Sequence, residues 1–261
     1  MSHPQQTHPS QDHGRRDGYG QGMVTIPRQF NGPPDSGNGG WVSGLLAQAH
    51  LDHGGSSPVS VRLRMPPPLD TELDVAHEDG QTRLVDPAGQ VVGTATDGAF
   101  GHEAPPFVDA KTVQRGHDAY PGFTIHPFST CFTCGVGRSA GDGLCIFTGP
   151  VGDGLVAGPW HVHESFADED GTTPLPISWS ALDCPGGWAA DFTEQAMLLG
   201  TMTAEILRRP EAGRTYHAVG RRSGRDGRKF FTATALYAPD GELLGRAEQV
   251  WIQIDPATLG S

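Results

Sequence analysis

The chain has 261 residues, of which 36% are hydrophobic, with 37 glycines, 22 prolines and a formal net charge of −12. This length suits one large domain or two smaller ones, and the many turn-forming residues favour sheet or mixed structure over a helical bundle. The acidic surface repels phosphates, so no nucleic-acid partner is expected, and no apolar run is long enough for a membrane span. Without a secretory signal, the four cysteines predict a cytoplasmic protein with free thiols.

The first structured unit is expected at residues 23–97, after an apolar-poor tail at 1–22 that is predicted to be disordered. The stretch "VTIPRQF" (24–30) looks like a short strand, and the stretch "GGWVSGLLAQAH" has apolar residues at helical spacing. Four strands should follow, because apolar stretches alternate with turn signals such as Asp79-Gly80. They are predicted in the segments 59–65, 71–78, 82–86 and 90–97.

A second unit is expected at 126–256, after a linker at 98–125 that is rich in glycine, proline and histidine, and before a short tail at 257–261. Its elements come in the same order as those of the first unit. The segments 142–149 and 154–160 look like strands, and 177–192 carries a helix whose start is predicted at "ALDCPGGW". Four further strands are predicted in 198–207, 215–222, 229–238 and 242–254.

Two short matches indicate that the second unit repeats the first. Gly39-Gly40-Trp41 matches Gly186-Gly187-Trp188, and 50 or 55 residues later the run from Gly89 to Ala95 matches the run from Gly241 to Ala247. Equal order and nearly equal spacing predict an internal duplication. A helix wrapped by an antiparallel sheet is the hotdog arrangement, so the predicted fold class is α+β, a double hotdog with two tandem units.

Basic residues are concentrated near the C-terminus, where eight of the eighteen lysines and arginines lie between residues 208 and 229. One interpretation is a solvated hairpin. The other is a binding surface for a small phosphorylated ligand.

The sequence resembles a known family at its first helix. "NGGWVSGLLAQA" is similar to the helix start of hotdog thioesterases, and residues 23–256 resemble the double-hotdog acyl-CoA thioesterases of the bacterial thioesterase II type. The resemblance is closest to an uncharacterised actinobacterial thioesterase-like group. It implies a hydrolase of lipid metabolism that cleaves acyl-CoA or acyl-carrier thioesters and uses no cofactor. It also implies that the protein can form a homo-oligomer.

The resemblance implies three catalytic residues that hold the hydrolytic water. They are Asp183 in Ala181-Leu-Asp183, Thr201 (with Thr203 as an alternative) and Gln249 on the last strand. An ionised aspartate at a helix start is a suitable general base, and a hydroxyl and an amide can orient the water. The sequence departs from the family pattern after Asp183, where Cys-Pro-Gly-Gly follows, and after Gln249, where Val-Trp follows. Asp183 could equally serve as a helix cap.

Substrate-binding residues are predicted at the two glycine-rich helix starts, where backbone N–H groups are free to face an oxyanion. These residues are Asn38, Gly39, Gly40, Gly186 and Gly187, together with Gln48 at the place where simpler hotdog thioesterases carry an acid.

Cys131-Phe-Thr-Cys134-Gly135 has the form of half a zinc site. Cys145, Cys184 or His126 could supply further ligands, but a second C-x-x-C is missing, so no metal is predicted. Cys184 is a further candidate nucleophile, because a helix start can lower a thiol pKa.

Two other functions remain open. One is a non-catalytic acyl-binding or structural hotdog protein, and the other is an enoyl-CoA hydratase. The hydratase would need an Asp–His pair, for which His50, His53 and His217 are the candidate histidines.

Overall fold

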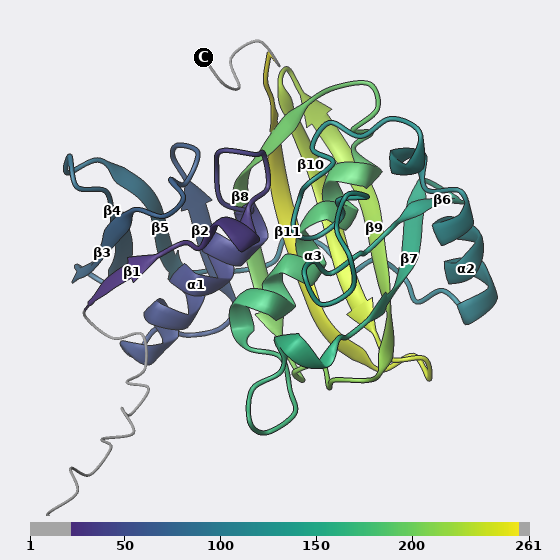
Figure 1. The fold of residues 1–261 in the computed structure, drawn as a ribbon, viewed down its shortest axis with the longest axis horizontal. Coiled ribbons are helices and arrows are strands. Elements are labelled where there is room, and N and C mark those ends of the chain that lie inside the picture. The colour runs from purple at the N-terminus through teal and green to yellow at the C-terminus, as the bar shows by residue number, and fades with distance from the viewer. Residues whose placement is uncertain (1–21, 256–261) are drawn as a thin grey trace, which may run out of the picture.

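The computed structural model describes residues 22–255, and its fold class is α+β, as predicted. Eleven strands form one antiparallel sheet, and two long helices, α1 and α3, lie against each other on one face of it (Figure 1). Apart from Gly22, the tails predicted at 1–22 and 257–261 lie outside the described residues. Within the part of the chain that the structure describes, no helix is both long and apolar enough to cross a membrane.

The first half of the sheet surrounds α1 (Gly39–Asp52) and has the strand order β1-β3-β4-β5-β2. The strands are β1 (Met23–Thr25), β2 (Val59–Leu63), β3 (Glu72–Glu78), β4 (Gln81–Val85) and β5 (Val91–Asp97). β2 to β5 match segments predicted from the sequence, whereas β1 overlaps only the first two residues of the strand predicted at 24–30. A short 3-10 helix, η1 (Arg28–Phe30), follows β1.

The second half surrounds α3 (Leu175–Ala189) and continues the sheet in the order β8-β11-β10-β9-β7-β6. Its strands are β6 (Gly149–Gly152), β7 (Leu155–His161), β8 (Met197–Ile206), β9 (Thr215–Asp226), β10 (Lys229–Tyr237) and β11 (Leu243–Gln253). A further 3-10 helix, η3 (Glu164–Phe166), lies between β7 and α3. The strand predicted at 142–149 is wrong, because residues 142–148 form a loop and β6 begins at Gly149.

The two halves join through β2 and β8, which pair in antiparallel register. Val61 lies opposite Met202, and both side chains are fully buried on the face that carries the helices. The next pair, Arg62 opposite Thr201, therefore points to the other face, because side chains alternate along a strand. The sheet is continuous across this junction.

Two glycines of α1 allow the helices to pack closely. A Cβ at Gly40 would lie 2.5 Å from the Cβ of Asp183, and a Cβ at Gly44 would lie 2.6 Å from the Cα of Pro176. Because the earlier glycine meets the later residue of α3, the two helices run antiparallel. This packing brings the start of α1 beside the middle of α3.

The predicted helix start at "ALDCPGGW" is wrong. α3 begins eight residues before Asp183, with Pro174 as its N-cap and another proline in its first turn, and it continues through Pro185. Gly186 and Gly187 therefore lie in its last turn, whereas Gly39 and Gly40 open α1, so this match does not pair equivalent positions. The second match does, because Gly89 and Gly241 both have positive φ in the turns that precede β5 and β11.

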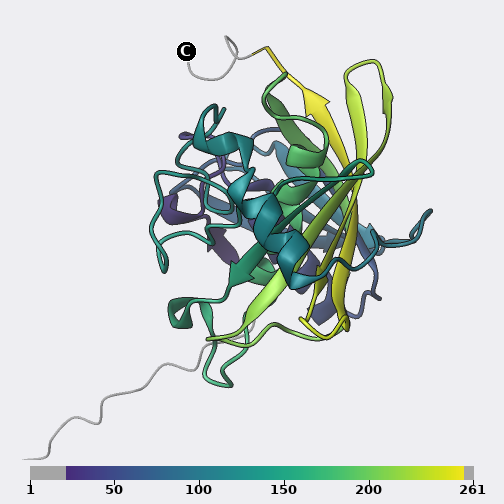
Figure 2. The same ribbon diagram turned by 90° about the vertical axis from the view of Figure 1, so that its right-hand side faces the viewer.

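The predicted linker at 98–125 carries structure of its own. It contains α2 (Ala110–Asp118), capped by Asp109, and the 3-10 helix η2 (Pro121–Phe123). α2 packs on β6 and β7 at the outer end of the second half (Figure 2). The loop that follows, residues 126–148, reaches α3, where the Thr133 hydroxyl donates to the Ser180 carbonyl at 3.2 Å.

Candidate functional site

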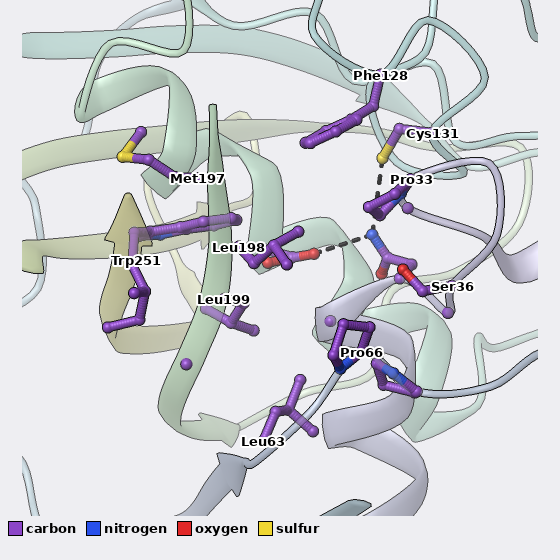
Figure 3. Close-up of a pocket in the computed structure, with 18 of the residues that line it drawn as sticks. Pro33, Ser36, Leu63, Pro66, Phe128, Cys131, Met197, Leu198, Leu199 and Trp251 are labelled. Atoms are coloured by element: carbon purple, nitrogen blue, oxygen red, sulfur yellow. Dashed lines mark hydrogen bonds between the residues drawn. The ribbon is translucent and has the colours of Figure 1, made fainter. Parts of the chain in front are cut away.

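A cavity of about 200 Å³ lies where the start of α1, the middle of α3, β8 and the 126–134 loop meet. Its wall is mostly apolar, with Phe128, Met197, Leu199 and Trp251 around it (Figure 3). Polar side chains also line it, and Asp183 is the carboxylate among them. The cavity therefore combines an apolar space with one acidic group, as ligand pockets with a reactive centre do.

Asp183 is 2% exposed and is held through one of its two oxygens. Oδ2 accepts hydrogen bonds from Asn38 Nδ2 at 2.9 Å and from the Gly40 N–H at 3.0 Å. Oδ1 is buried and has no hydrogen-bond partner among the described residues. A buried carboxylate oxygen without a partner is costly, so its persistence points to a ligand or water at this position.

The pKa of Asp183 is raised to about 7, mainly by burial and also by charge repulsion from the nearby Cys131 sulfur. The hydrogen bonds from Gly40 and Asn38 oppose this rise because they favour the charged form. The cause differs from the one predicted from sequence. Asp183 lies in the middle of α3 rather than at its start, and the helix start that faces it is the first turn of α1, through the Gly40 N–H. A carboxyl group with a pKa near neutrality is suited to general acid–base chemistry.

Asn38 reaches Asp183 because it caps α1. Its Oδ1 accepts from the Trp41 N–H at 2.9 Å, which leaves its Nδ2 free to donate to Asp183. The close approach at Gly40 then sets the distance between the helices. The sequence predicted Asn38 and Gly40 as substrate-binding residues and not as partners of the catalytic acid. The structure brings both to Asp183.

Gln249 also lies near Asp183, but it contacts the backbone of α3 rather than the carboxylate. Its Nε2 donates to the carbonyls of Leu182, at 2.7 Å, and Asp183, at 3.1 Å. Its Oε1 accepts from the Thr232 hydroxyl and the Trp251 indole. These bonds use both ends of the amide.

Pro185 interrupts the hydrogen bonding of α3 in the same turn, because it has no N–H to donate to the Ala181 carbonyl four residues earlier. Thr234 gives the Leu182 carbonyl a second donor at 2.8 Å. Thr232 and Thr234 were missed from the sequence. The signal available for Thr232 was its β10 position, which faces Gln249 in the β10–β11 register.

Thr201 is not brought to Asp183. It is half-buried, it lies opposite the exposed Arg62 on the outer face of the sheet, and it is not among the residues that line the cavity. Thr203 lies on the same outer face, where its hydroxyl donates to Ser60 at 3.0 Å.

Of the remaining predicted binding residues, Gly39 lines the cavity, and Gly186, Gly187 and Gln48 do not. Gly39 lies in the first turn of α1. Gly186 and Gly187 instead permit close packing, since a Cβ there would collide with Gln249 and with Phe192 respectively. Gln48 bonds to Asp52 at 2.9 Å, away from the cavity lining.

The Asp–His pair that a hydratase would need does exist, at the other end of α1. His50 Nε2 lies 3.0 Å from Asp97 Oδ1, and its Nδ1 lies 3.2 Å from the Thr82 hydroxyl. None of these residues lines the cavity. His53 stacks on a neighbouring histidine, and His217 bonds to the Val108 carbonyl.

The basic segment 208–229 is largely neutralised where its first arginines lie. Arg208 pairs with Glu242 at 2.6 Å, and Arg209 pairs with Asp168 at 2.6 Å. Neither arginine lines the cavity. Arg64, which is exposed and follows β2, is the arginine that does.

Three of the four cysteines meet beside Asp183. Cys131, Cys134 and Cys184 are buried, and their sulfur atoms all lie within 4.8 Å of one another. All three line the cavity. Burial raises the pKa of the Cys184 thiol, which makes it a poor nucleophile and does not support the catalytic role considered for it. Cys145 lies apart, near the Arg138 carbonyl.

Comparison with known proteins extends the fold assignment. No protein-family model matches the chain, and no curated protein sequence matches it. Among solved structures, the tesB protein of Mycobacterium avium subspecies paratuberculosis has a TM-score of 0.58 and 11% identity, with 92% of this chain and 96% of that chain covered. A protein of Thermobifida fusca assigned as a thioesterase II has a TM-score of 0.56 and 15% identity, with 89% and 92% covered. The chain thus has the fold of thioesterase II-like proteins over about nine-tenths of its length.

Proposed function

We propose that this chain is a double-hotdog hydrolase of acyl thioesters, with tandem units at 23–97 and 126–256. The feature that carries the proposal is Asp183, a buried carboxylate at an apolar cavity with one oxygen fixed and the other unpartnered. The thioesterase II fold, the antiparallel helix pair and the continuous sheet agree with it.

Asp183 acts as the general base. Its Oδ1 takes a proton from a water molecule while the water oxygen attacks the thioester carbonyl carbon. The Gly39 N–H stabilises the oxyanion, because it lies in the first turn of α1, where N–H groups lack an intrahelical partner, and Gly39 lines the cavity. The tetrahedral intermediate then loses the C–S bond. The thiolate leaves with the proton held by Asp183, so the products are a carboxylic acid and a thiol.

Asn38, Gly40 and Gln249 are positioning residues. Asn38 and Gly40 fix the orientation of the carboxylate through Oδ2. Gln249 fixes the turn of α3 that carries Asp183. Preorganisation of this kind is worth a large part of an enzyme's rate enhancement.

The substrate is an acyl-CoA or an acyl-carrier thioester with a short acyl chain. The cavity volume of about 200 Å³ is small compared with the roughly 300–1,000 Å³ of most ligand pockets. Its apolar wall suits the acyl chain, and Arg64 provides a positive charge for a phosphate of the carrier. The segment 208–229 is less suited to this role because Arg208 and Arg209 are paired with acids.

The test is thiol release from a series of acyl-CoA and acyl-carrier thioesters of increasing chain length. Asp183→Asn is expected to lower kcat/KM by about a hundredfold or more, because the proton acceptor is lost while the size of the side chain is kept. Asp240→Asn, in the β10–β11 turn, is the matched control and should retain full activity.

Thr201→Val distinguishes a site in which Asp183 alone activates the water from one in which Asp183, Thr201 and Gln249 hold it together. Its outer-face position predicts activity within about twofold of the unmodified protein. Thermal stabilisation by acyl-CoA without any thiol release would instead identify a non-catalytic acyl-binding protein. Hydration of an enoyl-CoA that is lost in His50→Ala would identify the pair at the other end of α1 as the active site.

A further inference from the structure

The three-cysteine cluster brings together two distant parts of the chain. Cys131 and Cys134 lie in the loop that follows η2, and Cys184 lies in α3, next to Asp183. The sulfur atoms of Cys131 and Cys184 are 3.6 Å apart, and none of the three cysteines forms a disulfide. In a tetrahedral zinc site with Zn–S bonds of about 2.3 Å, neighbouring sulfurs lie about 3.8 Å apart. The cluster therefore already has nearly the spacing that zinc requires.

The loop has the backbone arrangement of a metal-binding knuckle. The N–H of Gly135 donates to the Cys131 carbonyl at 2.9 Å, and a Cβ at Gly135 would lie only 2.5 Å from that carbonyl oxygen. The Cys131 sulfur is surrounded by hydrogen-bond donors, which are the thiols of Cys134 and Cys184 and the N–H groups of Cys134 and Thr133. Donors around a ligating atom orient it toward a metal.

Two further hydrogen-bond donors lie beside the cluster. The indole N–H of Trp188 is buried and has no partner at ordinary hydrogen-bond geometry among the described residues. Burial raises the pKa of the Cys134 thiol, and the nearby Trp188 indole partly opposes this rise. The Asn38 amide lies 3.7 Å from the Cys131 sulfur while it also holds Asp183, and Figure 3 draws both bonds as dashed lines. Such donors stabilise the negative charge that sulfurs retain when they bind a metal.

We propose that Cys131, Cys134 and Cys184 together bind one Zn²⁺ ion whose fourth coordination position opens into the cavity. Soft thiolates in a tetrahedral arrangement select zinc over harder cations. His126 does not complete the set, because its Nε2 lies 3.0 Å from the Cys134 carbonyl and its Nδ1 accepts from the Phe128 N–H. A water molecule in the cavity is the fourth ligand, beside the unpartnered oxygen of Asp183.

Each thiol gives up its proton when it binds the ion, so the bound site has three sulfur ligands and one oxygen ligand. Three protein ligands and one open position are typical of zinc that acts on a ligand, whereas purely structural zinc has four protein ligands. This inference replaces the expectation of no metal, which rested on the absence of a second C-x-x-C. It does not depend on the proposed hydrolysis, because metal content is measured without substrate.

The test begins with the full chain purified under reducing conditions without chelator. Elemental analysis should find about one zinc per chain. After zinc removal, Co²⁺ should bind with the sulfur-to-cobalt charge-transfer absorption and the intense visible bands of a four-coordinate thiolate site. Cys131→Ser and Cys184→Ser should weaken Co²⁺ binding by at least about a hundredfold. Cys145→Ser is the matched control and should bind normally, because Cys145 lies outside the cluster.

Thiol modification of the native, unmutated protein keeps the test valid if a cysteine variant fails to fold. With metal bound, only Cys145 should react readily, and a chelator should expose the other three thiols. The proposal is overturned if the metal-free protein shows no charge-transfer band with Co²⁺, or if Cys145→Ser loses binding as the cluster variants do. It is also overturned if mass spectrometry of the reduced-buffer preparation finds a Cys131–Cys184 disulfide in place of metal.

Discussion

At the scale of single residues, Asn38 has two tasks in one side chain. Its carbonyl oxygen caps α1, and its amide nitrogen holds Asp183. A capping residue needs only an acceptor, and serine and asparagine are about equally good at it. The second task needs a donor that reaches across to α3, and serine is too short to provide it.

Asn38→Ser is therefore expected to separate stability from activity. The free energy of unfolding should change by less than about 0.5 kcal/mol, because the cap is kept. The value of kcat should fall roughly tenfold or more, because the carboxylate loses one of its two fixed donors. Chemical denaturation and steady-state kinetics measure the two effects. Equal loss of stability and activity would show that Asn38 acts only as a cap.

The sequence named several residues of the cavity, but it did not indicate how they meet. Asp183, Asn38, Gly39 and Gly40 were all predicted, and the structure brings these four together. Their common location could not be predicted, because it depends on two helices that are far apart in the sequence. Thr201 shows the opposite problem. A shift of one position along a strand changes the face of the sheet, and sequence spacing alone did not fix that register.

At the scale of elements, α3 was the hardest to predict, and Pro185 is the reason. Proline followed by two glycines ordinarily ends or opens a helix, so a helix start was predicted there. The helix continues through the proline, and side chains from β10 and β11 donate hydrogen bonds to the Leu182 and Asp183 carbonyls of the preceding turn. These tertiary contacts support the helix there, and they leave no local signal in the sequence. The strands were easier, since apolar alternation and turn residues define them directly.

Gln249→Ala should therefore destabilise the protein through α3. We expect a loss of about 1–3 kcal/mol in the free energy of unfolding, because buried carbonyls and the Trp251 indole lose their partner. Gln253→Ala, the half-buried glutamine on the same strand, is the matched control and should change stability by less than about 0.5 kcal/mol. Urea denaturation measures both. If Gln249→Ala lowers the free energy of unfolding no more than Gln253→Ala does, Gln249 does not support α3.

At the scale of the whole molecule, the sheet and the helix pair tie the two halves together. β2 pairs with β8 across the junction, and α1 packs on α3 through Gly40 and Gly44. The helix-facing side chains of the strand pair are buried, and the helix pair is tightly packed. The duplication was predicted from the sequence partly on a match that does not pair equivalent positions, although the order of elements in the two halves is similar.

This coupling predicts that the halves unfold as one cooperative unit. Far-UV circular dichroism and tryptophan fluorescence should give coincident midpoints in urea. Hydrogen exchange should show β5 and β10 opening with the same free energy. Separate midpoints, or early exchange confined to β3–β5, would show that the junction does not couple the halves.

The hydrogen bond from Asn38 to Asp183 crosses between the two halves, and this has an evolutionary consequence. A gene that is cut within the 98–109 segment would produce two fragments, one with the amide and the other with the acid. Two identical copies of either fragment could rebuild the outline of the sheet but would lack one member of the pair. Once the two halves had diverged in this way, both would have to be kept in one gene. A symmetric homodimer of either half could no longer form the hydrogen bond between Asn38 and Asp183.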